Sequence, residues 1–175
     1  DNSNNPLRRQ IQVAIAAYRA GITSAVNLNI GGFDTHGNHD ASHIPRLLQV
    51  LDGLDFITEE AERQNLDGNY VVLTGSDFGR TPGYNDTNGK DHWSVTSVLA
   101  FGKGIRGGRV IGATDERHNL KTVNPKSLAV VDKGVRIEPK HIHQNLRRLA
   151  GIDQDPLMQF YPLSINADED MNLFS

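Results

Sequence analysis

One stretch constrains the fold more than any other: a long amphipathic segment that leads through a short turn into an apolar run. Residues 42–64, with Ser42 as cap, place apolar side chains at helical spacing and charged side chains on the opposite face. Asp67 and Gly68 then form a turn, and YVVLTG at residues 70–75 is almost continuously apolar. Such a run is typical of a strand that a parallel sheet buries on both faces. The stretch therefore predicts a helix followed by a buried strand.

The same alternation of patterns runs through the rest of the chain. Helical spacing recurs over residues 6–21 and 138–152, and strand-like apolar runs recur over residues 23–30, 95–102, 109–114 and 127–131. Helices that alternate with strands are typical of the α/β class. We therefore expect a layered, mainly parallel sheet flanked by helices. Because the sequence shows no repeat, low-complexity segment or linker, we expect residues 1–175 to form one domain.

Composition narrows the classes of function. The net charge of −3 gives no general basic surface for nucleic acid, and no apolar run approaches the roughly 18 residues of a membrane-spanning helix. The chain has no cysteine, which excludes disulfides, cysteine-based zinc fingers and thiol nucleophiles. Any metal must therefore be bound by histidine, aspartate, glutamate or asparagine, which suit zinc, manganese, iron or calcium.

Three polar stretches adjoin the predicted strands: FDTHGNH at residues 33–39, SDFGRTP at 76–82 and GKDHW at 89–93. Because ligands in open α/β sheets bind beside the carboxyl ends of the strands, we expect these stretches to meet. Carboxylates and imidazoles together are typical of hydrolytic zinc or manganese sites, with calcium as an alternative. The candidate metal ligands are Asp34, His36, His39, Asp77, Asp91 and His92.

Each of these residues also has a purely structural interpretation. Asp34 suits the cap of a turn, with His36 in solvent, and Asp77 suits a turn or the cap of a short helix. Arg80 suits either an ion pair with Asp77 or the bidentate binding of an oxyanion. Three other histidines suit surface or structural positions: His43, His141 and His143.

Taken as a set, the motifs carry a family resemblance. GFDTHGN, LTGSDFGRTP, GKDHW and GKGIRGGRVIG occur in this order across residues 8–152. They resemble a bacterial family built on a domain of unknown function, whose members are usually secreted and often described as sulfatase-like. That family is grouped with the alkaline phosphatase-like superfamily. The resemblance implies the metal-dependent hydrolase fold shared by alkaline phosphatases, sulfatases and cofactor-independent phosphoglycerate mutases.

The resemblance also implies roles for individual residues. Asp34 and His36 would hold a metal from the first loop, and His92 would hold it from a later one. Asp77 matches the superfamily's aspartate after the central strand. The spacing from Asp34 to His36 is shorter than the superfamily's usual spacing, which makes His39 a substitute ligand.

Two further roles and one departure follow from the same comparison. Asp91 would bind the metal or orient His92, and Arg80 would contact the oxyanion of the ester. Phe78 stands after Asp77, where the superfamily often has histidine. A complete second metal site is therefore not expected.

The implied function is hydrolysis of a phosphate or sulfate ester, on a small molecule or a polysaccharide, in the periplasm or outside the cell. Members of the family are longer, so we expect the C-terminal portion of a larger domain whose nucleophile lies elsewhere. A sheet edge left exposed would favour association. The alternative is a non-catalytic member that binds a cell-envelope ligand or a partner protein. A hydrolase complete in this chain would need Ser76 as nucleophile, and no strained elbow motif surrounds it.

Overall fold

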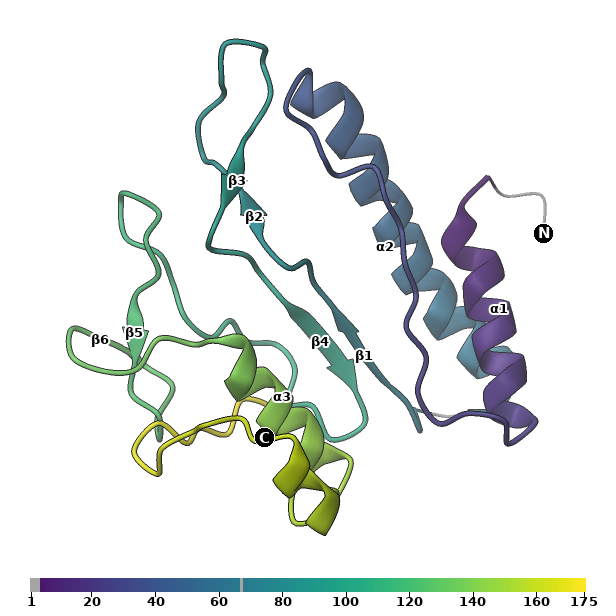
Figure 1. Ribbon diagram of the computed structural model, residues 1–175. Coiled ribbons are helices and arrows are strands. Elements are labelled where there is room, and N and C mark those ends of the chain that lie inside the picture. Colours follow the sequence, from purple (N-terminus) through teal and green to yellow (C-terminus); the bar gives the residue numbers. More distant parts are fainter. Residues whose placement is uncertain (1–3, 67) are drawn as a thin grey trace. The chain divides into compact units, whose positions relative to one another are not determined.

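The computed structural model describes residues 4–66 and 68–175, and the chain forms two compact units (Figure 1). The first unit comprises Asp1–Tyr70 and Ser76–Thr96, and the second comprises Val71–Gly75 and Ser97–Ser175. Of the predicted turn, Asp67 lies outside the described residues. The expectation of one domain, and of a larger parent domain, stays a prediction.

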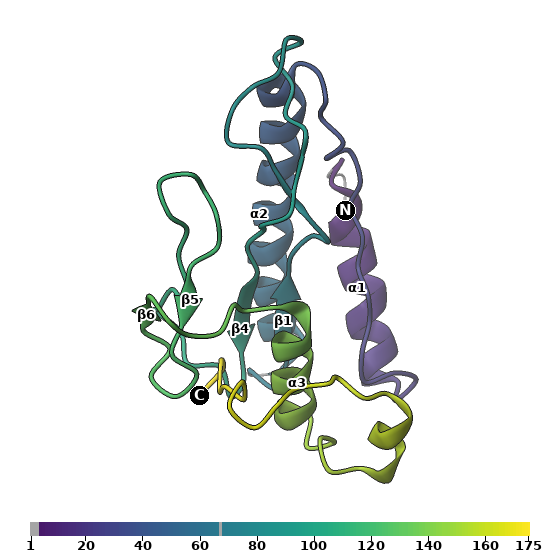
Figure 2. The same ribbon diagram turned by 60° about the vertical axis from the view of Figure 1, so that its left-hand side comes forward.

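Two helices form the framework of the first unit. α1 (Pro6–Arg19) and α2 (His39–Arg63) pack side by side, as Figures 1 and 2 show. The Asn5 side chain caps α1 by accepting the Leu7 amide at 3.0 Å, and Pro6 supplies the preset first turn. Apolar burial then joins the helices, through Leu7, Ile11 and Phe56. The predicted helix over residues 6–21 is confirmed.

α2 begins three residues before the predicted Ser42 cap. The reason lies outside the helix, because a distant loop satisfies its first amides. Asn38 donates its amide to the Thr87 carbonyl at 3.1 Å, and His39 donates to the Asn88 carbonyl at 2.8 Å. No serine cap is needed when backbone carbonyls already accept these donors.

The predicted strand over residues 23–30 does not form. Its backbone is instead paired with one side chain, because the Gln10 amide donates to the Asn29 carbonyl at 2.8 Å and accepts the Asn29 amide at 2.9 Å. Leu28 and Ile30 pack against the α1–α2 core. Leu28 and Ile30 are therefore partly buried against helices and not within a sheet, whereas Val26 is exposed.

The strands pair only in short antiparallel ladders. In the first unit, β2 (Gly79–Arg80) pairs with β3 (His92–Trp93), which sets Arg80 opposite His92. In the second unit, β1 (Val71–Thr74) pairs with β4 (Leu99–Gly102), and β5 (Thr122–Val123) pairs with β6 (Val130–Val131).

The prediction of a layered, mainly parallel, alkaline phosphatase-like sheet is therefore wrong. Every sheet among residues 4–66 and 68–175 is two-stranded and antiparallel. A parallel connection requires a crossover, usually a helix, but the chain between β1 and β4 contains only loops and the β2–β3 pair. Nor is β1 buried on both faces, since Val71 and Leu73 are exposed.

The second unit buries its core beneath α3 (Pro139–Leu149), which precedes a 3-10 turn, η1 (Pro156–Phe160). Val123, Met171, Leu173 and Phe174 form the buried cluster, against which α3 packs. The buried Asn145 side chain fixes the C-terminal segment, because it donates to the Met171 carbonyl at 2.9 Å and accepts the Leu173 amide at 2.8 Å. The predicted helix over residues 138–152 is confirmed.

His141 lies in the interior of the second unit, with 1% of its surface exposed. Its Nδ1 accepts the Glu138 amide at 2.9 Å, which caps α3, while its buried Nε2 has no hydrogen-bond partner among the described residues. Burial disfavours the charged imidazolium and lowers the pKa of His141 from its ordinary 6.5.

We predict that α3 loses stability as the pH falls below about 6.5, because the unfolded chain then binds a proton that folded His141 resists. Above that pH both states are neutral and this contribution is constant. Hydrogen exchange of the α3 amides at pH 7.5 and 5.5 measures the effect. In His141→Gln, whose amide oxygen can still accept the Glu138 amide, the pH dependence should shrink. An unchanged pH dependence in that variant would assign it to other groups.

Candidate metal centre

Three ligand atoms of the first unit converge: Asp34 Oδ1, His36 Nε2 and His92 Nε2. The separations are 3.0 Å from Asp34 to His36, 3.2 Å between the histidine nitrogens and 3.8 Å from Asp34 to His92. Asp34 and His36 lie on the loop before α2, and His92 opens β3. We call these three residues the metal triad.

The size of this triangle can be compared with metal–ligand bond lengths. A triangle with sides of 3.0, 3.2 and 3.8 Å has a circumscribed circle of radius about 2.0 Å, so one point lies about 2.0 Å from all three atoms. Zinc binds histidine nitrogen and carboxylate oxygen at roughly 2.0–2.2 Å, whereas calcium needs roughly 2.3–2.6 Å and more oxygen ligands. The triangle therefore allows bonds of about 2.0 Å, and its two imidazole nitrogens suit zinc or manganese better than calcium, which prefers oxygen ligands.

Asp91 fixes the orientation of the His36 ring. Because a carboxylate only accepts, His36 Nδ1–H donates to Asp91 Oδ1 at 2.8 Å, which leaves the lone pair on Nε2. That hydrogen bond and one from Asn85 hold the pKa of Asp91 below its usual range. A carboxylate behind a ligand histidine is typical of metal sites. Asp91 thus contacts His36, and not His92 as the resemblance suggested.

Arg80 supplies positive charge at the edge of the triad. Its guanidinium donates to Asp34 Oδ1 at 2.9 Å and to the Lys90 carbonyl at 3.0 Å, and it lies 3.3 Å from His36 Nε2. The Arg80 side chain is only 12% exposed, whereas that of Asp34 is 77% exposed. The hydrogen bond from Arg80 lowers the pKa of Asp34, so the carboxylate stays ionised and able to bind a cation.

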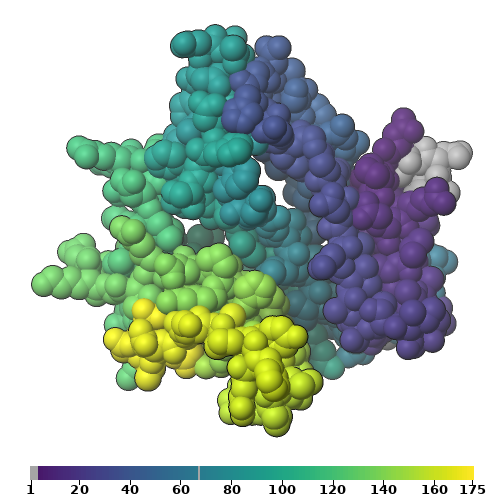
Figure 3. Space-filling view, viewed as in Figure 1, coloured from purple at the N-terminus to yellow at the C-terminus, as the bar shows by residue number. Residues whose placement is uncertain are grey.

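The loop before α2 that carries Asp34 and His36, called the triad loop, is held by hydrogen bonds with the loop over residues 85–90. Lys90 donates its amide to the Thr35 carbonyl at 2.9 Å, and the Asn85 side chain donates to the His36 carbonyl at 3.0 Å. Figure 3 shows the two loops in contact, in teal and blue. A Cβ atom at position 89 would overlap the His36 carbonyl, so only glycine permits this approach.

Comparison with known proteins identifies the family. The chain matches the family described as "Protein of unknown function (DUF1501)" over residues 6–163. The chain belongs to the DUF1501 family. This confirms the predicted domain-of-unknown-function family, while its sulfatase-like, alkaline phosphatase-like affiliation stays a prediction. No curated protein and no solved structure gives a significant match.

The sequence of this DUF1501 chain has no apolar run long enough for a membrane-spanning helix. Within residues 4–66 and 68–175, no helix combines the length and apolar character needed to cross a membrane.

Two predicted ligands lie outside the triad of this DUF1501 chain. His39 is buried, with Nδ1 2.6 Å from the Thr35 hydroxyl and its ring stacked on His43 at 4.3 Å. His39 therefore stabilises the triad loop through Thr35 and does not point to the ion position. Asp77 is exposed and does not belong to the cluster of converging ligand atoms.

Three residues around the site were not singled out from the sequence as parts of it: Asn85, Lys90 and, as a contact of His92, Phe78. Asn85 links both loops, because its side chain also accepts the Gly89 amide at 2.8 Å. The turn-forming sequence NDTNG could have marked this loop as rigid, but it gives no sign of what the loop touches.

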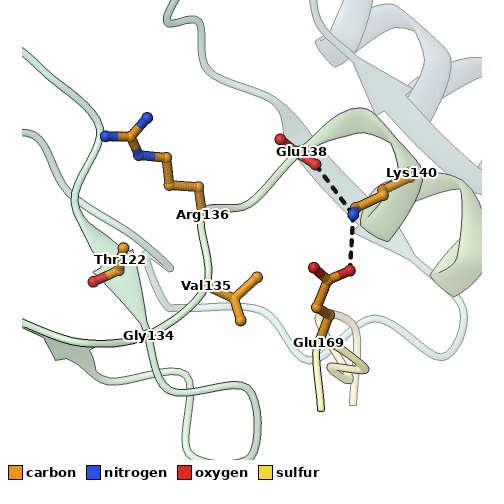
Figure 4. Close-up of a pocket in the computed structure, with 7 residues that line it drawn as sticks. All are labelled: Thr122, Gly134, Val135, Arg136, Glu138, Lys140 and Glu169. Carbon is orange, nitrogen blue, oxygen red and sulfur yellow. Dashed lines mark hydrogen bonds and ion pairs between the residues drawn. The ribbon is translucent and has the colours of Figure 1, made fainter. Parts of the chain in front are cut away.

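A second candidate region is the hollow of about 340 Å³ in the second unit (Figure 4). Arg136 and Lys140 line it, and Lys140 pairs with Glu138 at 3.3 Å and with Glu169 at 2.8 Å. With its charge already matched by two carboxylates, Lys140 is a poor anion-binding group. The hollow contains none of the predicted site residues.

We predict that Gly89→Ala weakens zinc binding about tenfold or more, because the added methyl group would push the His36 backbone out of place. The matched control is Gly83→Ala, also between β2 and β3, where a Cβ meets nothing within 4 Å. Calorimetric zinc titration of both variants makes the comparison. Equal affinities would show that the loop contact does not position His36.

Proposed function

We propose that this chain binds one zinc- or manganese-sized ion through Asp34, His36 and His92 and takes part in hydrolysing phosphate or sulfate esters. The observation that carries the proposal is the triangle of ligand atoms, whose size matches bonds of about 2.0 Å to a common centre. A carboxylate with two imidazoles is also the ligand combination of hydrolytic zinc sites.

Each residue around the triad has a defined task in this proposal. When bound, the ion would polarise an ester oxygen and lower the pKa of water. Asp91 holds the His36 ring so that Nε2 faces the ion position. Arg80 keeps a permanent planar cation 2.9 Å from Asp34 Oδ1, so that an anionic ester at the triad would also meet the guanidinium.

In this proposal the site contributes metal and anion binding, and its hydroxyl groups are poor nucleophiles. The Thr35 hydroxyl lies 2.6 Å from His39 Nδ1 but is buried. The hydroxyl of Ser76 donates to the Phe78 carbonyl at 2.7 Å and lies 3.1 Å from the Thr96 hydroxyl. Neither partner is a base that could take its proton. This supports a nucleophile other than Ser76, either water or a group beyond the described residues.

Other parts of the proposal rest on the motif resemblance alone. They are the sulfatase-like affiliation, a small-molecule or polysaccharide ester as substrate, and a periplasmic or extracellular location. The resemblance is carried by the sequence motifs, not by the fold.

The second candidate is a non-catalytic member that binds a cell-envelope ligand or a partner protein. The observation that favours it is the Arg80–Asp34 ion pair, in which the guanidinium already neutralises the only carboxylate of the triad. In that case Arg80 would take the place of a metal ion and the cluster would be structural. The two candidates differ in whether the triad binds zinc at all.

We predict that the chain binds one zinc ion and that His92→Ala lowers the affinity at least about 100-fold, because one of three ligands is lost. His92 is more than half exposed, so the substitution should leave the fold intact. His143→Ala, on the exposed face of α3, is the control and should bind as the wild type does. Calorimetry with zinc, manganese and calcium decides between the candidates, because a wild type that binds none of the three contradicts the hydrolase.

We predict opposite effects of Arg80→Gln on zinc and on ester turnover. Removing a cation that shares Asp34 should leave zinc affinity equal or higher, whereas kcat/KM for an aryl phosphate or sulfate should fall about 10- to 100-fold. Arg80→Lys keeps the positive charge but not the planar guanidinium, so its kcat/KM should lie between those of the wild type and Arg80→Gln. If Arg80→Gln lowers thermal stability and the wild type binds no zinc, the non-catalytic candidate stands.

A further inference from the structure

Phe78 is an aromatic residue whose observed ring contacts are with the site. Its ring lies 4.2 Å from the His92 ring, centroid to centroid, with 31° between the planes. The Arg80 guanidinium lies 5.7 Å from the same Phe78 centroid. Among the described residues, Phe78 belongs to neither hydrophobic cluster of the protein, although it is half-buried. Its position is therefore not explained by packing into the core.

The two histidines of the triad are held in different ways. His36 donates Nδ1–H to Asp91, which fixes the ring plane and the tautomer. His92 has no such arrangement, because the contacts of its ring nitrogens in the described structure are those of Nε2 with Asp34 and His36. Ligand histidines usually have their second nitrogen hydrogen-bonded to a carboxylate, a carbonyl or water. Two rings contact that of His92, the His36 ring at 5.0 Å and the Phe78 ring at 4.2 Å, and the nearer Phe78 ring restricts rotation most.

We propose that Phe78 is a positioning residue of the metal triad: its ring, packed against that of His92, keeps His92 Nε2 directed at the ion position. This inference rests on the proposed metal function and adds to it a residue that contacts neither the ion position nor the substrate. Rotation about the Cβ–Cγ bond of His92 would move Nε2 away from Asp34 and His36, and the tilted Phe78 ring, 4.2 Å away, hinders that rotation.

Arg80 depends less on the same ring. Its guanidinium is already fixed by hydrogen bonds to Asp34 and the Lys90 carbonyl, and 5.7 Å is near the outer limit of a cation–π contact. Loss of the Phe78 ring should therefore weaken metal binding through His92 more than anion binding through Arg80.

The test combines zinc titration with NMR of the His92 ring in three variants. Phe78→Leu removes the ring but keeps apolar bulk, Phe78→Tyr keeps the ring, and Phe160→Leu removes an exposed ring of the second unit as a control. We expect Phe78→Leu to lower zinc affinity about tenfold, while the Tyr variant and the control bind as the wild type does. In metal-free protein, the His92 ring protons should lose their upfield ring-current shift only in Phe78→Leu.

Each outcome supports or overturns the proposal. Equal zinc affinity in wild type and Phe78→Leu overturns the inference and leaves the metal function standing, whereas a wild type that binds no zinc overturns both. If Phe78→Leu does not fold, the ring-current shift of His92 in the wild type and the zinc affinity of Phe78→Tyr still test the proposal. Absence of the upfield shift of His92 in wild type, or zinc binding weakened equally in Phe78→Tyr, contradicts positioning by the ring.

Discussion

The close approach of two loops, with Gly89 against the backbone of His36, is the constraint on which the rest of the site depends. It aligns the carbonyl of Thr35 with the amide of Lys90 and supplies the acceptors that start α2 at His39. The same contact brings Asp34 and His36 beside His92, although they are more than 50 residues apart in the chain. The start of the longest helix and the geometry of the candidate metal site therefore have one cause.

The electrostatics of the site are set by a competition for one carboxylate. Asp34 is the only anion of the triad, and it pairs with Arg80 in the structure. A divalent ion would have to share Asp34 with that guanidinium, which reduces affinity but places a cation where an anionic ester would approach. Asp91 offsets part of this cost, because its negative charge lies 2.8 Å from His36 Nδ1.

The sequence predicted the parts of the fold that depend on local patterns. Helices over residues 6–21, 42–64 and 138–152 follow from apolar spacing, and all three form, although the second begins at His39 and is not capped by Ser42. The predicted parallel strand direction was wrong, because an apolar run such as residues 70–75 does not reveal its partner strand. The predicted strand over residues 23–30 was wrong because the Gln10 side chain pairs with its backbone. Both errors concern long-range contacts, which no local period encodes.

The same limit applies to the candidate site. The motifs predicted Asp34, His36 and His92 as neighbours, and the structure brings them together. It does not bring Asp77 to them, since the prediction placed this residue at the edge of a parallel sheet that does not form. In the sequence, Phe78 is a departure from the superfamily pattern and has no visible role. Its contact with His92 could not be predicted, because it depends on the antiparallel pairing of β2 and β3.

X-ray absorption spectroscopy of the zinc-loaded chain tests the central claim most directly. The account predicts one zinc with two imidazole ligands and at least one oxygen at about 2.0 Å, and one imidazole fewer in His92→Ala. Zinc with a single imidazole in wild type, or an unchanged imidazole count in His92→Ala, would contradict the triad as the metal-binding site.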